Sequence, residues 1–394
     1  MATNVSDALK ICYWPEATFG TAPLVTDKLT RLRFQGNSIK AAPERVDSDE
    51  IDVNRESVRD IVEVFRKSAG DLNVELTPTD YYKFFAAALC GTLTPVSASY
   101  TCDIGFTPIS KLTLATDWPA AFDGQPMFVR VTGATNPLNN GIKMVLARGT
   151  SATELWFQAG SFVEAQTGAT VTLYYNTANC GTTLKSFTFQ KQYTSLSTNN
   201  YANFHGLSVD KITLKLASKQ KITAAISFVG GEYHWDTDHL GDGTPTEPST
   251  DPVLATGLFP EAMFGTLGAQ DYPIESVELT IANNLLDRPV LGQQTSNEFG
   301  LGKLEITGKI NAYFENHAAA EAFYTAADAT SYGLWLFIGK ASVAKMGIYL
   351  PKIQLTNGNP EEGASGTDMM LPMEFRACRH ATLPMAKLSY VTLA

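Results

Sequence analysis

The sequence predicts a mainly β protein: a duplicated β-sandwich with one helix in each copy, plus an inserted small β module. Most of the chain alternates apolar and polar residues with a period of two, which is typical of strands that bury one face and leave the other in water. The pattern of parallel α/β enzymes, in which long helices separate continuous apolar strands, is missing, so we expect antiparallel sheets. Only two segments are predicted to be helical.

The strands that define the two copies are the clearest. In residues 72–76 the three apolar side chains share one face, while Asn73 and Glu75 share the other. The same alternation marks four further runs: Ile212–Leu216, Ile222–Phe228, Val277–Ile281 and Leu304–Ile306. Each run is therefore expected to form a strand at the surface of a core.

Each predicted helix comes directly after a strand. The first follows Leu76, with Thr79 or Asp80 expected as its N-cap, and is expected to stop at Gly91. The second follows Asn316. A strand followed by a helix in each half indicates an internal duplication.

A shift of 238 positions supports this duplication, because it aligns identical residues of the two halves. The matches within residues 70–89 are Gly70/Gly308, Asn73/Asn311, Phe85/Phe323 and Ala88/Ala326. Each copy also contains a long polar excursion, over residues 37–69 and 283–302. Loops of this length in matching places are more often functional than accidental.

We expect four parts in the chain. The first copy comprises residues 1–92 and 184–233, and it is interrupted by the inserted outer module at 93–183, which opens with a Ser/Ala-rich stretch. Insertions occur where the host backbone is exposed. A connector rich in Gly, Pro, Asp and Thr spans 234–272, and the second copy spans 273–394.

Composition narrows the class of function. With 30 basic and 40 acidic side chains the net charge is −10, which argues against a surface that coats nucleic acid by neutralising phosphates. No apolar run approaches the roughly 20 residues of a membrane-spanning helix and no secretory signal is visible, so we expect a soluble protein made in a cytosol. The five cysteines are expected to be reduced thiols in apolar spaces, although a Cys102–Cys180 bond is conceivable.

No catalytic, cofactor or metal site is expected. The sequence has no phosphate-binding loop, nucleophile elbow, zinc-protease motif or dinucleotide fingerprint, and its five histidines are scattered. Residues 236–247 imitate a calcium-binding frame, but Leu240 occupies a ligand position and Pro245 stiffens the far end, which favours a solvated connector. Trp118, Trp156 and Tyr174 are of the type that stacks on sugars, but packing in a core or rim is their commoner role.

Several segments, taken in order, carry a resemblance to a known family. In the first half they are Glu44–Ile51, Arg55, Gly70–Leu76 and Ala87–Gly91; in the second half they are Leu279–Leu285, Thr307–Glu315, Tyr349–Ile353 and Leu371–Ala377. In order and spacing they resemble the major tail tube proteins of bacteriophages with long, flexible, non-contractile tails (siphoviruses). The similarity covers most of the chain outside the inserted module.

The resemblance implies a structural virion protein, with no enzymatic activity and no cofactor. Tail tube subunits polymerise as stacked rings, their sheets join into a barrel around a channel, and DNA passes through this channel during ejection into the host. If both copies are tube folds, three chains supply six quasi-equivalent units. A trimeric, pseudo-hexameric ring is therefore favoured over a true hexamer.

The resemblance also implies partners and a location. The subunit would contact itself within and between rings, the tape measure protein in the lumen during assembly, the tail tip and tail terminator proteins, and transiting genomic DNA without sequence-specific binding. No membrane contact is implied. The protein would be found in the virion tail, and in the host cytoplasm during assembly.

Five residues on the wet faces of the strands are candidates for the lumen wall: Asn73, Glu75, Glu278, Glu305 and Asn311. Such a wall should be acidic or neutral and poor in Lys and Arg, so that it repels the phosphate backbone. These residues could equally face outward, because alternation defines two faces without naming the lumen. Lys309, on the same alternation, would need a carboxylate neighbour.

The two excursions are the candidates for ring-to-ring contacts. Their charged members are Glu44, Arg45, Asp47, Asp49, Glu50, Arg55, Arg59 and Arg288. Arginine pairs with carboxylates in a bidentate manner, although ordinary surface ion pairs would look the same in the sequence. Two alternatives stay open: a carbohydrate-binding or adhesin protein of the tail that works through the inserted module, and a glycan-cleaving enzyme with paired carboxylates.

Overall fold

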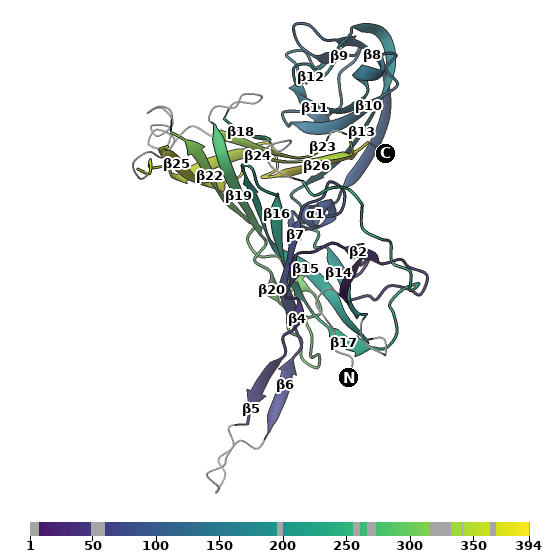
Figure 1. The fold of residues 1–394 in the computed structure, drawn as a ribbon, viewed down its shortest axis with the longest axis vertical. Helices are drawn as coiled ribbons and strands as arrows, with labels where there is room; N and C mark the ends of the chain where they lie inside the picture. Colours follow the sequence, from purple (N-terminus) through teal and green to yellow (C-terminus); the bar gives the residue numbers. More distant parts are fainter. Residues whose placement is uncertain are drawn as a thin grey trace.

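The structure is a computed structural model that describes residues 8–48, 60–194, 200–254, 261–265, 273–314, 332–340, 342–362 and 368–393. The prediction of a mainly β fold is confirmed, because strands dominate the described chain and a single α-helix accompanies them there. Figure 1 shows a body of crossed sheets, a compact lobe made of β8 to β13 at one end, and a narrow hairpin arm at the other.

The first half of the chain forms strands on both sides of the helix. Before the lobe come β1 (Leu9–Pro15), β2 (Thr30–Leu32), β3 (Gly36–Asn37), β4 (Lys40–Ala41), β5 (Glu44–Asp47), β6 (Ile61–Phe65), β7 (Ser68–Glu75) and α1 (Tyr82–Ala88). After the lobe come β14 (Ser186–Tyr193), β15 (Asn200–Ala217), β16 (Thr223–Gly230) and β17 (Tyr233–Asp236). Among the residues described, strands β5 and β6 form a two-stranded sheet of their own, which is the arm (Figure 1).

The second half of the chain contributes a further series of strands. They are β18 (Glu261–Gly265), β19 (Ile274–Ala282), β20 (Leu286–Asp287), β21 (Phe299–Gly300), β22 (Glu305–Tyr313), β23 (Tyr332–Lys340), β24 (Ala344–Asn357), β25 (Met370–Ala377) and β26 (Lys387–Thr392). Strands β20 and β21 form a second small hairpin. The helix predicted after Asn316 lies outside the described residues.

Six antiparallel strands from both halves form one sheet, here called the shared sheet, in the order β7–β16–β15–β19–β22–β25. The halves meet where the C-terminal part of β15 pairs with β19. Residues 200–208 of β15 pair instead with β14, so this long strand continues beyond the shared sheet and changes partners along its length. In the second half β24 does the same, because it pairs with β23 and β26 before its last residues join β25.

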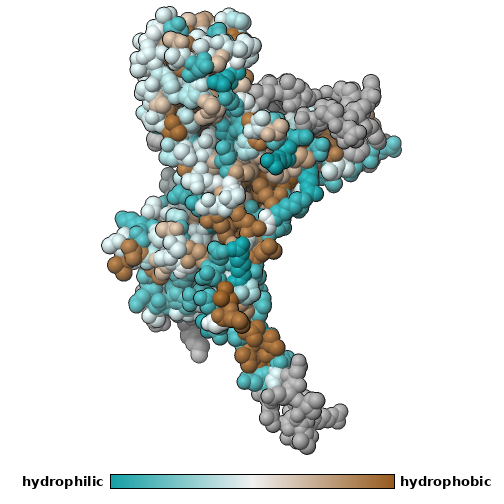
Figure 2. Space-filling view, turned by 180° about the vertical axis from the view of Figure 1, so that it is seen from behind, coloured by the Kyte–Doolittle hydropathy of each residue, from teal (hydrophilic) through white to brown (hydrophobic). Residues whose placement is uncertain are grey.

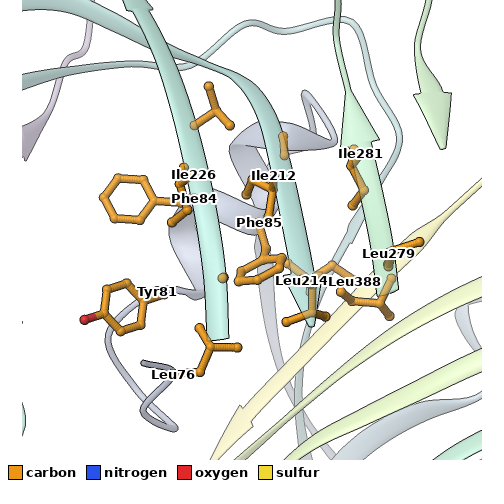
Figure 3. Packing of buried hydrophobic residues seen from close by; sticks show 14 of the residues in the cluster. Leu76, Tyr81, Phe84, Phe85, Ile212, Leu214, Ile226, Leu279, Ile281 and Leu388 are labelled. Carbon is orange, nitrogen blue, oxygen red and sulfur yellow. The ribbon is translucent and has the colours of Figure 1, made fainter. Parts of the chain in front are cut away.

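The shared sheet buries one of its two faces. Its inward side chains belong to one hydrophobic cluster that also contains α1 and buried residues of β1, β14, β23, β24 and β26, which we call the second layer. Phe84 and Phe85 of α1 are at most 1% exposed, and Figure 3 shows them beside the strands that carry Ile212, Leu214 and Ile226. The alternation found in the sequence therefore arises because one side of each strand contacts this core.

The N-cap predicted for the helix is wrong. Tyr81 is the N-cap residue, and its side chain makes no capping hydrogen bond. Both predicted caps have other partners: Thr79 Oγ1 donates to Asp251 Oδ2 at 3.0 Å, and Asp80 Oδ2 accepts from Thr77 Oγ1 at 2.5 Å. These contacts tie the start of α1 to the segment that follows β17.

The lobe encloses a second hydrophobic cluster. Its strands are β8 (Thr94–Gly105), β9 (Lys111–Thr113), β10 (Met127–Thr132), β11 (Gly141–Arg148), β12 (Glu154–Phe157) and β13 (Gln166–Asn179), with short 3₁₀ turns at Ala120–Phe122 and Pro137–Asn139. The cluster also includes Trp335, Phe337 and Tyr349 of β23 and β24, so the lobe packs against the second half. The proposed boundaries of copies, module and connector stay a prediction. The connector segment contains β18 and all of β17 except its first residue, Tyr233.

All five cysteines are free thiols, so Cys102 and Cys180 form no disulfide. Burial raises the pKa of Cys12 to about 12 and that of Cys90 to about 11. These thiols therefore stay protonated at neutral pH and act as small apolar side chains. Among the described residues, no helix has the length and apolar character needed to cross a membrane.

Candidate functional site

The exposed face of the shared sheet carries polar side chains in rows that cross both halves of the chain. One row consists of Glu75, Thr223, Lys215, Glu278, Lys309 and Glu374, each opposite the next on the neighbouring strand. Acidic and basic side chains alternate along its second-half part. Lys309 thus has the carboxylate neighbour it was expected to need on both sides, Glu278 and Glu374.

The next row along the strands is mostly uncharged. It consists of Asn73, Ala225, Thr213, Thr280, Thr307 and Arg376. Where the two halves meet, the Oγ1 atoms of Thr213 and Thr280 lie 3.3 Å apart. At the far edge, Arg376 Nη2 lies 2.5 Å from Glu305 Oε1. Hydroxyl pairs and ion pairs of this kind are the cross-strand contacts that stabilise an antiparallel sheet.

All five candidates for the lumen wall lie on this face, and none of them is buried. Asn311 Nδ2 donates a hydrogen bond to Ser276 Oγ at 3.1 Å. A depression of about 470 Å³ opens on the same face, lined among others by Glu75, Glu278 and Asn311. The structure therefore gathers these residues on one surface, and their position in a lumen stays a prediction.

The face is balanced in charge, whereas the expected wall was poor in Lys and Arg. Its carboxylates are Asp71, Glu75, Glu278, Glu305 and Glu374, and its cations are Lys211, Lys215, Lys221, Lys309 and Arg376. Lys215 Nζ lies 3.4 Å from Glu278 Oε2, and Lys221 Nζ lies 2.8 Å from Glu75 Oε1. The surface is thus neutral because its cations stand among carboxylates.

The arm begins beside the small hairpin of the second half, so the two predicted excursions come together in space. Lys67 Nζ forms an ion pair with Asp287 Oδ2 at 2.6 Å, and the Arg66 amide donates to the Gln294 carbonyl at 2.6 Å. Arg66 Nε also contacts Glu63 Oε1 at 2.8 Å. These contacts fix the base of the arm, while its strands extend away from the body (Figure 1).

The charged candidates for ring contacts have different surroundings. Glu44, Arg45 and Asp47 lie exposed on β5, where Arg45 Nη2 is 3.7 Å from Glu63 Oε2. Arg288 forms an ion pair with Glu298 inside the β20–β21 hairpin. The remaining candidates, Asp49, Glu50, Arg55 and Arg59, lie outside the described residues.

The charge-based prediction missed the apolar character of the arm. Val46, Ile61, Val62 and Val64 are between 46% and 57% exposed. Figure 2 shows apolar residues gathered where the arm leaves the body. The signal was present in the sequence, because Ile61–Phe65 is apolar at every position except Glu63. An exposed apolar patch of this kind marks a contact surface.

The other candidate sites have structural roles. Asp236 Oδ1 accepts from the amides of Thr237 and Asp238, and these bonds lower the pKa of its carboxyl. In the described part of the chain, no three His, Cys, Asp or Glu side chains gather to hold a metal ion. The Asp236 carboxylate and the amides of Thr237 and Asp238 therefore close a turn in the segment that imitates a calcium site.

The aromatic residues of the lobe are engaged within the protein. Trp118 is 1% exposed, and Trp156 Nε1 donates to Glu154 Oε2 at 3.0 Å. The guanidinium of Arg130 covers the ring of Tyr174 at 4.3 Å. Packing, the commoner role of such residues, accounts for all three.

The fold and this face define a mainly β protein in which strands from both halves of the chain share one sheet with an exposed polar surface. Comparison with protein families gives the class a name: the sequence matches the phage tail tube protein family over residues 7–377, and the chain belongs to that family. It is therefore a structural protein of the phage tail. Among curated protein sequences the chain has no match.

Proposed function

We propose that this protein polymerises as stacked rings into the tail tube, and that the polar face of the shared sheet lines the channel through which the genome leaves during ejection. The observation that carries the proposal is the continuity of this face. Its charged row, from Glu75 to Glu374, is polar at every position and runs through strands of both halves, across the β15–β19 pairing. A surface repeated in this way is suited to enclose a channel when further copies continue it.

The ends of the shared sheet support closure into a ring. At one end of the sheet, the strands that pair with the outer edge of β7 are the two-residue strands β3 and β4. At the other end, the last residues of β24 pair with the outer edge of β25. Such edges need a partner, and a head-to-tail contact between identical chains closes when the rotation is right. Because each chain supplies two similar halves, three chains would give six units around the axis.

The charge balance of the face suits a wall along which DNA slides. A phosphate backbone binds to surfaces that neutralise it with unpaired Lys and Arg side chains. Here Lys215, Lys221 and Arg376 each lie within 3.4 Å of a carboxylate oxygen. The wall would therefore attract the phosphates weakly and would also repel them weakly.

The arm and the β20–β21 hairpin are the proposed contacts between successive rings. They share a base, and both expose apolar side chains beside charged ones, while the arm projects from one end of the body (Figure 1). Apolar side chains would supply most of the contact energy, and charged residues such as Arg45 would select the partner.

Family membership supports further partners at this same assembly. The tape measure protein would occupy the lumen during assembly in the host cytoplasm. Tail tip and terminator proteins would contact the two end rings. DNA would be a transient occupant without sequence-specific contacts, and no membrane contact is part of the proposal.

Negative-stain electron microscopy of the purified protein, with its solution mass measured alongside, tests the proposal. Rings or tubes with a central channel are expected, and the mass of one ring should be three times the 42.7 kDa of the chain. A sixfold mass would support the channel and contradict the trimer. A protein that stays monomeric even with tail tip components would contradict the ring itself.

A further inference from the structure

The two halves of the chain meet where β15 pairs with β19, and we call this pairing the closed joint. The two outer ends of the shared sheet carry the corresponding strands, between which the described residues supply no partner strand, and we call this pair of edges the open joint. In the closed joint, residues 211–217 of β15 lie between β16 and β19. In the second half, the corresponding segment follows the end of β24. The closed joint therefore supplies a template for the open one, provided that the subunits form rings as proposed above.

Strand pairing aligns the two halves residue by residue on one side of the joint. The repeated glycines Gly70 and Gly308 each face a phenylalanine on the next strand, Phe228 and Phe375. At both glycines an added Cβ would lie within 2.4 Å of backbone of the strand on the other side. The same close approach is thus built into both halves at the same place.

One strand further, the two ladders shift at the same position. The shift lies between residues 209 and 211 in β15 and between residues 355 and 357 in β24. In the first half, Lys215 lies four residues after Lys211 and pairs with the first residue of β16. In the second half, Glu361 lies four residues after Asn357 and forms a bridge to the first residue of β25. Residues 357–361 therefore correspond to residues 211–215.

The partner strand of the joint can be aligned in the same way. Gly36 of β3 and Ser276 of β19 lie opposite the repeated asparagines of β7 and β22. Three residues later, Ile39 and Leu279 occupy the same place in the core, each 1% exposed. Residues 36–42 therefore correspond to residues 276–282.

The backbone of β3–β4 shows which groups face the open edge. The amides of Ser38 and Ala42 donate to carbonyls of β7 and of Lys67 at 2.9 and 2.7 Å. Because backbone groups alternate along a strand, those of residues 37, 39 and 41 point to the other side. In the closed joint this side of β19 bonds to β15, as in the 2.7 Å bond from the Asn283 amide to the Asp210 carbonyl.

The register of the closed joint, applied to the open one, places Pro360 opposite Ile39. Pro360 corresponds to Leu214 and has no N–H to donate. The Ile39 carbonyl does not depend on that donor, because Lys191 Nζ donates to it from within the protein. Lys191 is only 9% exposed, so a buried cation serves this one carbonyl. The N–H that Pro360 lacks would therefore have bonded to the Ile39 carbonyl, which already accepts a hydrogen bond from Lys191.

We propose that residues 357–362 of one subunit form an antiparallel strand beside residues 37–42 of the next subunit, with Pro360 opposite Ile39. In the described part of the chain, no strand lies on the outer edge of either segment. Asn359 then faces Lys40 where Thr213 faces Thr280 in the closed joint.

Charge and composition of the two edges agree with this pairing. Glu361 faces Ser38 and lies diagonal to Lys40, at a distance where opposite charges attract. Pro360 and the preceding Asn357-Gly358 are residues that blunt an exposed edge and suppress irregular pairing of free subunits.

Cysteine pairs test the register directly. Asn359→Cys with Lys40→Cys is the matched pair, and Asn359→Cys with Ala42→Cys is shifted by two residues along the same edge. Thr213→Cys with Thr280→Cys is the positive control, because its Oγ1 atoms are already 3.3 Å apart within one chain. After mild oxidation of assembled rings, non-reducing gels should show covalent multimers for the matched pair and monomers for the shifted pair. The positive control also runs as a monomer, because its bond closes within one chain, but it should lose two titratable thiols that the shifted pair keeps.

The outcomes separate this register from the ring proposal. Rings without cross-links in the matched pair, or with cross-links only in the shifted pair, would overturn the register and leave the ring standing. Absence of rings from the unmodified protein would overturn both. If the matched variant does not assemble, Glu361→Cys with Ser38→Cys tests the same register one pair further along.

The lysine and the proline offer an independent test by rescue. Lys191→Met should weaken ring assembly, because the Ile39 carbonyl then has no donor from either subunit. Adding Pro360→Ala restores an N–H opposite that carbonyl and should recover assembly. A double variant that assembles no better than Lys191→Met would overturn the proposed pairing of residues 360 and 39.

Discussion

Replacing Phe84 by alanine would remove the ring at the centre of the core under the shared sheet. The side chain is fully buried, and the rings of Tyr13, Phe187 and Phe228 have centroids 4.9, 5.0 and 5.6 Å from its own. These three neighbours come from β1, β14 and β16. Since all three strands would have to move to close the space, the cavity would persist.

The expected loss in the free energy of unfolding is about 4 kcal/mol, the middle of the range for replacing a buried phenylalanine by alanine. About 1 kcal/mol of this reflects lost edge-to-face contacts. Lys83→Ala on the same helix is the matched control. Because Lys83 is exposed, its removal should change stability by less than about 0.5 kcal/mol.

Urea unfolding of the free subunit, followed by far-ultraviolet circular dichroism, measures both variants against the wild type. A shift of the Phe84→Ala midpoint to much lower urea is expected, with the control unchanged. A loss below about 1 kcal/mol for Phe84→Ala would refute the reasoning. It would mean that α1 does not hold the two layers together.

Three further changes test other features. Gly308→Ala should lower the free energy of unfolding by about 2 kcal/mol, because the added Cβ would lie 2.3 Å from the Glu278 carbonyl oxygen. Gly36→Ala is the control, because its Cβ would meet nothing closer than 3.5 Å, and equal Tm values for the two variants would contradict this crowding. Burial lowers the pKa of Lys191 from 10.5 to about 8, so the cost of burying its ammonium is complete below about pH 8 and disappears toward pH 10.5. Wild-type stability relative to Lys191→Met should therefore rise by about 3 kcal/mol across that window in urea unfolding, and a difference that does not vary with pH would contradict it. Val62→Asp on the arm, at a side chain 52% exposed, should leave subunit stability within about 0.5 kcal/mol but shorten the tubes seen by electron microscopy, and tubes of normal length would contradict the role of the arm.

The faces of the strands were predictable because the direction of a side chain is a local property of a strand. Asn73 and Glu75 alternate with buried residues, as do Glu278, Glu305 and Asn311, and the structure places them all on one surface. The repeated glycine and asparagine of β7 and β22 were also visible. The faces of these strands can be predicted from each segment alone, without the rest of the chain.

The neighbours across strands were not predictable, because they depend on pairing between distant segments. Lys309 lies between two carboxylates only because β22 lies between β19 and β25. The N-cap failed for the same reason: Thr79 bonds to Asp251, which is 172 residues away. The arm was judged by its charges, although its apolar side chains become informative once its two strands are seen to stand alone.

Strands β15 and β24 each pair with different strands along their length, and this has a mechanical consequence. The two layers of the continuous sheet cannot slide over each other without breaking the backbone ladder of a strand that they have in common. Each subunit is therefore stiff against shear. If the rings stack through the arms as proposed, bending would concentrate between rings, at contacts made by side chains. Each ring would stay rigid, and the tail would bend at the contacts between rings.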